Sequence, residues 1–402
     1  MSDHYLTEQH HQLRAEVRAF ALSKVAPRVA DMELAKRVET DLVREIAGRG
    51  WIGATIGQEY GGMGTGHLAK TIIIEELSRV SAAVGAAVQA SQLGTAKIIH
   101  FGSEEQKRAW LPRIAAGECL PTIAVTEHGS GSHLLGMEMR ARREGRHYVL
   151  NGRKIYVGNS HIGDLHGVVA RTGEGTRGLS AFLVEAGRPG LTLSAPAGTL
   201  GLHGFSFGEL RFHNCRVPAG SRLGTEGDGR DIADSSSVLY GRPNLAAVAL
   251  GIHQAILDQV TKFANERTRY GRPLVKLPNI KLKLGLIESR VMSARLAVYH
   301  ATHLLDIGEG DDAALFNAKL VNAELVLDSV RAAMEIHAAA GLTTDIPMER
   351  YLRDAQHIQA PAGTSDVQAL RLAEVALGTS ESRWSQLLAD VLAAEKKPLA
   401  LS

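Results

Sequence analysis

Residues 345–366 read DIPMERYLRDAQHIQAPAGTSD, and this run joins two helical patterns through a short loop. The pattern predicts one helix over residues 348–356 and another over residues 364–391. Between them Pro361 stiffens the chain, although it removes only its own backbone N–H. The sequence therefore predicts a loop, flanked by two helices, that presents Ala362.

The rest of the C-terminal third is also predicted to be helical. One helix carries an apolar stripe at helical spacing, formed by Leu245, Val248, Ala249, Ile252, Ile256, Val260 and Phe263. Pro243 lies near the start of this helix, where a proline is least disruptive. Further helices are predicted over residues 278–307 and 311–339, and the tail from Glu395 to Pro398 is expected to fray.

The sequence pattern is different in the middle third of the chain. Residues 121–230 hold short alternating runs separated by Gly, Asn and Pro, and Asn151-Gly152 after one such run predicts a hairpin. Helices are predicted before this region, over residues 6–50, 68–94 and 103–111. We therefore expect an α+β chain with an N-terminal α-helical domain (1–120), a middle β domain (121–230) and a C-terminal α-helical bundle domain (231–402).

Bulk composition excludes several functional classes. The 402 residues are 45% hydrophobic and 22% charged, as expected of a globular protein with two or three domains. The net charge of +2 gives no case for nucleic acid or an acidic membrane surface. No apolar run approaches the ~18 residues of a membrane span. Cys119 and Cys215 lie far apart in sequence and suggest reduced thiols in the cytoplasm. No metal site is predicted.

Several segments, taken in order, carry a family resemblance that covers nearly the whole chain. They read AVTEHGSGSH at 124–133, YVLNGRKIYVGN at 148–159, LGLHG at 200–204, ERTRYGRPL at 266–274 and EIHAAAG at 335–341. Together with residues 345–366, they resemble the acyl-CoA dehydrogenase family of flavoproteins. The resemblance implies an N-terminal all-α domain, a middle β-barrel-like domain and a C-terminal four-helix-bundle domain. It also implies a homotetramer or homodimer.

The resemblance further implies FAD, rather than FMN, as the cofactor. The implied cofactor-binding residues are Val125, Thr126, Ser132, Tyr156, Gly158, Arg267, Arg269, Tyr270, Glu335, Ala339, Thr364 and Asp366. In this set, Tyr156 replaces the family's usual Trp, and Gly158 replaces a Thr or Ser whose hydroxyl bonds the flavin N5 edge. Glu335 replaces a neutral amide, and alanines 338 and 339 replace glycines.

Two of these cofactor assignments have a simpler structural alternative. Taken alone, the segment around Thr126 and Ser132 reads as a Gly/Ser surface turn. Arginines such as Arg267 at a helix C-terminus are favoured by the helix dipole even without a ligand. The planar guanidinium fork also suits a pyrophosphate, and the surrounding segments favour that reading here.

The residue expected to act as the catalytic base is missing. The family's usual base is a Glu at the position of Ala362, and some branched-chain members carry it at the position of Gly241. Tyr240 is adjacent, but a phenol with a pKa near ~10 is a poor base. The implied substrate-binding residues are Ser132, Tyr240, Gly241, Arg242, Ala362 and Gly363.

Three functional hypotheses follow from the missing base. The first is an oxidoreductase that acts on an acyl-CoA or acyl-carrier-protein thioester through an unrecognised base, with an electron acceptor as partner. The second is different flavin chemistry, either an elimination that needs no α-proton base or an O₂-dependent monooxygenase supplied by a flavin reductase. The third is a catalytically silent binding subunit, which the retained Thr364, Arg267 and Tyr156 argue against.

Overall fold

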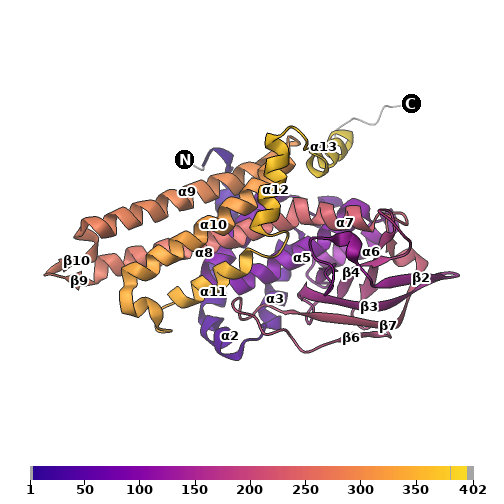
Figure 1. Ribbon diagram of the computed structural model, residues 1–402, viewed down its shortest axis with the longest axis horizontal. Coiled ribbons are helices and arrows are strands. Elements are labelled where there is room, and N and C mark those ends of the chain that lie inside the picture. The colour runs from indigo at the N-terminus through magenta and orange to yellow at the C-terminus, as the bar shows by residue number, and fades with distance from the viewer. Residues whose placement is uncertain (1–2, 381, 396–402) are drawn as a thin grey trace.

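The computed structural model describes residues 3–380 and 382–395 and shows a mixed α+β fold (Figure 1). Residues 396–398 of the tail that was expected to fray lie outside these ranges. Three long helices run along the long axis of the molecule, the large sheet lies at one end, and a small hairpin lies at the other. None of the described helices is long and apolar enough to cross a membrane.

The N-terminal region contains more helices than the sequence pattern predicted. The helices are α1 (Glu8–Phe20), α2 (Val29–Ala35), α3 (Thr40–Ala47), α4 (Gly66–Val80), α5 (Ala82–Phe101) and α6 (Glu104–Ala115). The single helix predicted over residues 6–50 is wrong, because the left-handed Lys36 ends α2 at φ 50°. The helix predicted over 68–94 is likewise two helices, because Ser81 adopts an extended conformation between α4 and α5. The Ser81 side chain caps α5 by accepting a hydrogen bond from the Val84 N–H.

The middle region forms an eight-stranded sheet in the order β6-β7-β3-β2-β4-β5-β8, with β1 paired to β4. The strands are β1 (Pro121–Ala124), β2 (Arg140–Glu144), β3 (His147–Gly158), β4 (Leu165–Arg171), β5 (Leu179–Glu185), β6 (Leu191–Leu193), β7 (Phe207–Pro218) and β8 (Arg222–Leu223).

The hairpin predicted at Asn151-Gly152 is wrong. These residues lie inside β3, where the pairing with β7 shifts register between Leu150 and Gly152. Gly152 adopts φ 136°, and the Asn151 side chain accepts a hydrogen bond from the Asn214 N–H at 2.8 Å. The pair that signals a turn in sequence is used here for a β-bulge that bends one long strand.

The C-terminal region is helical, as predicted. Its elements are α7 (Gly229–Ser236), α8 (Arg242–Glu266), β9 (Thr268–Arg269), β10 (Arg272–Pro273), α9 (Pro278–Ile307), α10 (Asp312–His337), α11 (Met348–Ile358), α12 (Ser365–Ala376) and α13 (Trp384–Glu395). The helix predicted over 364–391 is interrupted after α12, where Gly378 turns the chain at φ 69°. Helices α8, α9 and α10 lie side by side, and α12 lies beside α10 (Figure 1).

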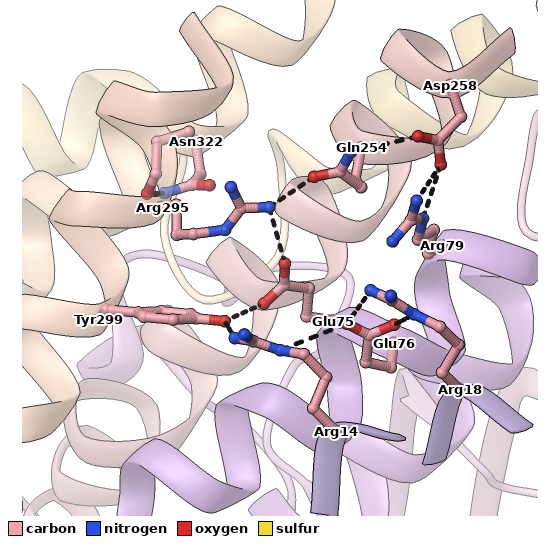
Figure 2. A network of polar contacts seen from close by, with 11 residues as sticks. Arg14, Arg18, Glu75, Glu76, Arg79, Gln254, Asp258, Arg295, Tyr299 and Asn322 are labelled. Atoms are coloured by element: carbon pink, nitrogen blue, oxygen red, sulfur yellow. Dashed lines mark hydrogen bonds and ion pairs between the residues drawn. The ribbon is translucent and has the colours of Figure 1, made fainter. Parts of the chain in front are cut away.

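A buried polar network fixes α4 against α1 and α9 (Figure 2). Glu76 receives two hydrogen bonds of 2.9 Å from Arg18. Glu75 accepts one from Arg295 at 3.1 Å and another from the Tyr299 hydroxyl. Both carboxylates are only 2% exposed, so their charges depend on these partners. We call this set, completed by Arg14, the Glu75 network.

Candidate active site

The two positions where a base was expected lie next to each other in space. Gly241 ends a π-helical turn, Ser237–Gly241, that leads directly into α8. A Cβ placed on Gly241 would lie 3.1 Å from the Cβ of Ala362, 3.7 Å from Ser237 Oγ and 3.9 Å from a methyl carbon of Leu93. We call Leu93, Ser237, Gly241 and Ala362 the base junction. It contains no carboxylate from any of its four members.

The loop that carries Ala362 is held by a residue that the sequence argument missed. Gln368, on the first turn of α12, donates to the carbonyl oxygens of Ala362 at 3.1 Å and Gly363 at 3.0 Å. Its Oε1 accepts a hydrogen bond of 2.9 Å from Nε of Arg242. Ala362 itself has φ 56°, a left-handed conformation that the clamp maintains.

Arg242 supports this loop from the interior rather than from the surface. Its side chain is 8% exposed and its guanidinium carbon lies 4.9 Å from the centre of the Phe316 ring. Burial lowers the pKa of Arg242 to about 10, against the opposing effect of nearby Asp234. The structure therefore places Arg242 behind the loop, where it acts through Gln368; direct contact with a substrate stays a prediction.

Tyr240 points away from the base junction into the helical core. Its hydroxyl donates to Thr55 Oγ1 at 3.1 Å, and the Lys70 ammonium lies 4.2 Å from its ring centre. Burial raises the pKa of Tyr240 above its ordinary value. A buried phenol with a raised pKa does not deprotonate near neutral pH, so Tyr240 does not replace the missing base.

A second group of predicted residues lies at the end of β3. The Ile155 N–H donates to the Thr126 carbonyl at 2.9 Å, and Lys154 donates to the Val125 carbonyl at 2.8 Å. These bonds bring the loop after β1 against β3. Ser132 lies further along that loop and is exposed.

Tyr156 presents an open aromatic face. Its side chain is 60% exposed, and its ring stacks on Phe207 with centroids 5.6 Å apart and planes at 14°. Phe207 also contacts His357 of α11 edge-on, at 5.5 Å. A planar aromatic ligand can stack on such a surface. Gly129 and Gly131, on the nearby loop, border open space where a Cβ would meet nothing within 4 Å.

Gly158 has no room for the side chain that it replaces. A Cβ at this position would lie 2.8 Å from the outer ring carbon of Phe205 and 3.2 Å from the Ala90 Cβ. The Phe205 ring thus occupies the space into which a Thr or Ser would project. The sequence predicts the lost hydroxyl but not the Phe205 ring that fills its place.

A third group lies at the opposite end of the molecule, around the β9–β10 hairpin (Figure 1). Arg267, Arg269 and Tyr270 are exposed there, and Tyr270 is 89% exposed. Glu335, near the end of α10, forms an ion pair with Lys283 of α9. Lys283, and not Arg267 or Arg269, therefore balances the negative charge of Glu335, which stands where an amide was expected.

The residues predicted to bind the cofactor thus lie in three places within one chain: at the end of β3 with the loop after β1, around the β9–β10 hairpin, and at the start of α12. Thr364 and Asp366 are exposed at the start of α12, where the Thr364 hydroxyl caps the helix by accepting from the Val367 N–H at 3.3 Å. Ala339 belongs with the hairpin end, and beside it Ala338 adopts φ 51° and ψ −131°, a conformation suited to glycine. Within the described ranges, no group of His, Cys, Asp and Glu side chains could hold a metal ion.

Comparison with known proteins agrees with this geometry. Residues 7–118, 122–215 and 227–377 match the N-terminal, middle and C-terminal domain models of acyl-CoA dehydrogenase. An acyl-CoA dehydrogenase of Bacillus subtilis (strain 168) is 35% identical over 377 residues, covering 93% of this chain and 99% of the relative. The chain belongs to the acyl-CoA dehydrogenase family.

Solved structures of the family superpose closely. Butyryl-CoA dehydrogenase from Megasphaera elsdenii gives a TM-score of 0.90 at 30% identity, over 92% of this chain and 99% of that one. A prolyl acyl-carrier-protein oxidase gives a TM-score of 0.86 at 29% identity, over 92% and 99%. Membership of the acyl-CoA dehydrogenase family makes the protein a flavin-dependent oxidoreductase of the acyl-thioester class.

Proposed function

We propose that the protein binds FAD and an acyl thioester, either acyl-CoA or acyl-carrier protein, and oxidises the acyl group without a carboxylate at either usual base position. The observation that carries this proposal is the base junction, where Gly241 and Ala362 face each other. The α-proton therefore has no carboxylate acceptor at the base junction and must pass to another acceptor, while Tyr156, Arg267 and Thr364 of the flavin site are retained.

The chain's own residues have defined parts in this reaction. The Ala362 N–H, which has no acceptor among the described residues, is available to the thioester carbonyl as negative charge develops on its oxygen. Gln368 fixes the loop that carries this N–H. Tyr156 offers the aromatic face that a flavin ring would cover, and the flavin supplies the hydride acceptor when bound. Gly158 provides no hydroxyl to the N5 edge of the flavin.

FAD suits the separated cofactor residues better than FMN. Arg267 and Arg269 present guanidinium groups that can grip the pyrophosphate, which FMN lacks. They belong to the β9–β10 hairpin region, at the end of the molecule opposite the sheet whose strand β3 carries Tyr156, so one FAD can contact Tyr156 and the arginines only if a second copy supplies the arginines. We therefore propose a homodimer or homotetramer. Exposed apolar side chains support this assembly, among them Leu282, Leu286, Leu370 and Leu377.

The domain boundaries and the location of the protein remain part of the proposal. The order of helices, sheet and helices supports domains at 1–120, 121–230 and 231–402. Buried, free Cys119 and Cys215 support a reducing compartment such as the cytoplasm.

The same junction favours a second candidate function. An elimination from an acyl thioester needs no α-proton base, and an O₂-dependent monooxygenase reaction with supplied reduced flavin needs none either. Each reaction is compatible with a site that keeps its flavin surface and lacks a base. In either case the partner would be a flavin reductase or no redox partner, instead of an electron acceptor.

Chromatography of the flavin released by heating tests the cofactor, and titration of the holoprotein with butyryl-CoA and with butyryl-carrier protein tests the substrate class. We expect FAD, and a ligand-induced shift of its visible bands with at least one thioester. A colourless protein that ignores added FAD and FMN would contradict the proposal and leave only a binding role.

A further inference from the structure

Two buried amide side chains lie beside the base junction on facing helices. On α5, Gln89 is one helical turn before Leu93, and on α8, Asn244 is about one turn after Gly241. Residues one turn apart share a helix face, so Gln89 lies on the same face as Leu93, and Asn244 on the same face as Gly241. The Asn244 Nδ2 donates to the Gln89 backbone carbonyl at 3.3 Å, which places the two residues in contact.

Both amides carry an oxygen without a partner. Gln89 is 8% exposed and Asn244 is fully buried. Within the part of the chain that the structure describes, neither Gln89 Oε1 nor Asn244 Oδ1 accepts a hydrogen bond. A buried acceptor left unpaired costs free energy that an apolar side chain of the same shape would avoid. Two such oxygens, on residues that are in contact beside the base junction, are therefore expected to receive a ligand's donor.

The burial pattern gives the direction in which a ligand would run. Leu93, Ser237 and Ala362 are half-buried, so the reacting carbon of a substrate would reach the junction from outside. Asn244 lies deeper, about 4.5 Å further along α8 at 1.5 Å per residue. An acyl chain spans that distance in about three or four bonds of ~1.5 Å.

We propose that the substrate's acyl group carries a hydrogen-bond donor, a hydroxyl or an N–H, about three or four bonds beyond its α-carbon. Gln89 and Asn244 would accept from this donor. This inference rests on the proposed function and narrows it to thioesters of short acyl groups with a polar end. A simple alkyl chain would leave both amide oxygens unpaired after it had displaced any water.

The test compares 5-hydroxypentanoyl-CoA with hexanoyl-CoA, which carries a methyl group where the first has its hydroxyl. Dissociation constants are measured on the holoprotein by anaerobic titration of the visible flavin bands. We expect the hydroxylated thioester to bind at least about tenfold more tightly. In Asn244→Leu and in Gln89→Met the preference should fall, and the two variants should unfold at or above the wild-type temperature.

Asn322→Leu is the matched control. Asn322 is also buried with an unpaired Oδ1, but it joins α9 and α10 rather than lining the junction. Its replacement should leave the preference unchanged. If Asn244→Leu does not fold, the wild type and Gln89→Met still decide the question.

Equal binding of the two thioesters, tighter binding of hexanoyl-CoA, or a preference that survives both substitutions would overturn the inference and leave the proposed function standing. Failure of the holoprotein to bind any CoA or carrier-protein thioester would overturn both.

Discussion

The Glu75 network joins α1, α4 and α9, whereas the base junction and the two amides beside it lie on α5, on α8 with the turn before it, and on the loop before α12. The two regions differ in whether their buried polar groups are paired. In the network, each carboxylate oxygen of Glu75 and Glu76 accepts a hydrogen bond (Figure 2). At the base junction neither Gly241 nor Ala362 carries a carboxylate, and the amide oxygens of the neighbouring Gln89 and Asn244 have no partner among the described residues.

This contrast distinguishes the paired carboxylates, which hold the helices together, from the two unpaired amides that lie beside the base junction. Pairing of buried polar groups is the rule in protein interiors, and the carboxylates of Glu75 and Glu76 obey it. Departures from that rule are expected at functional sites, where a ligand completes the pairing. Gln89 and Asn244, beside the base junction, depart from it, while Gln368 holds the loop that carries Ala362.

Breaking the paired region should have the largest effect on stability. Glu75→Ala leaves Arg295 and Tyr299 without their buried acceptor, and loss of one member of a buried charged pair costs about 3–5 kcal/mol. Chemical denaturation should show this loss. Glu185→Ala removes an exposed ion pair with Arg188 and should change stability by less than about 0.5 kcal/mol. Equal effects would show that the network is not a structural support.

Lys70, on α4, packs against the ring of Tyr240 and makes the stability of the protein depend on pH. It is fully buried, its ammonium lies 3.1 Å from His67 Nδ1, and burial lowers its pKa to about 7 despite the opposing charge of Asp306. Between pH 7 and about 10.5 the unfolded chain therefore binds one proton more at Lys70 than the native chain does. The free energy of unfolding contributed by this group rises with pH across that window.

The matched variant for this prediction is Lys70→Met. It should be more stable than wild type at pH 7 by a few kcal/mol, about 1.4 kcal/mol for each unit of pKa shift and less after relaxation. Its advantage should shrink as the pH approaches 10. A constant difference from pH 6 to pH 10 would contradict a lowered pKa for Lys70.

Gly158→Thr tests the packing around Gly158 in the candidate active site. The new side chain would collide with Phe205, so we expect about 1–3 kcal/mol of destabilisation, measured by thermal unfolding. Gly158→Thr combined with Phe205→Ser should recover most of the loss. If the single variant is as stable as wild type, the Phe205 ring does not occupy that space.

Ala338→Gly should have the smallest effect, a small increase in the free energy of unfolding. Ala338 holds φ 51°, a conformation that strains any residue with a Cβ, and the glycine should add about 1 kcal/mol of stability. Ala339 has no positive φ, so Ala339→Gly should lose up to about 1 kcal/mol. Equal changes at the two positions would show that the strain at Ala338 is not significant.

The sequence predicted the order of the fold well, because long helices and alternating strands leave strong periodic patterns. It failed where one local signal has two uses. Asn151-Gly152 favours a hairpin turn and a β-bulge alike, and only the pairing of β3 with β7 decides between them.

The candidate site was only partly predictable. The resemblance drew attention to Ala362 and Gly241, whose proximity no periodic pattern reveals. Phe205, Gln368 and Asn244 act through tertiary contacts, so little in their local sequence marked them. Asn244 alone among them carries a sequence signal, because it is a polar residue at a core position of an apolar helix.

The absence of a base at the junction is tested most directly by anaerobic stopped-flow reduction of the bound flavin with butyryl-CoA. Wild type is compared with Ala362→Glu, which restores a carboxylate at the junction. One general base contributes about 10²–10⁴ in rate, so wild-type bleaching should be slower than that of the variant by up to this factor. Bleaching of wild type as fast as that of Ala362→Glu would contradict the account and require a base elsewhere in the site.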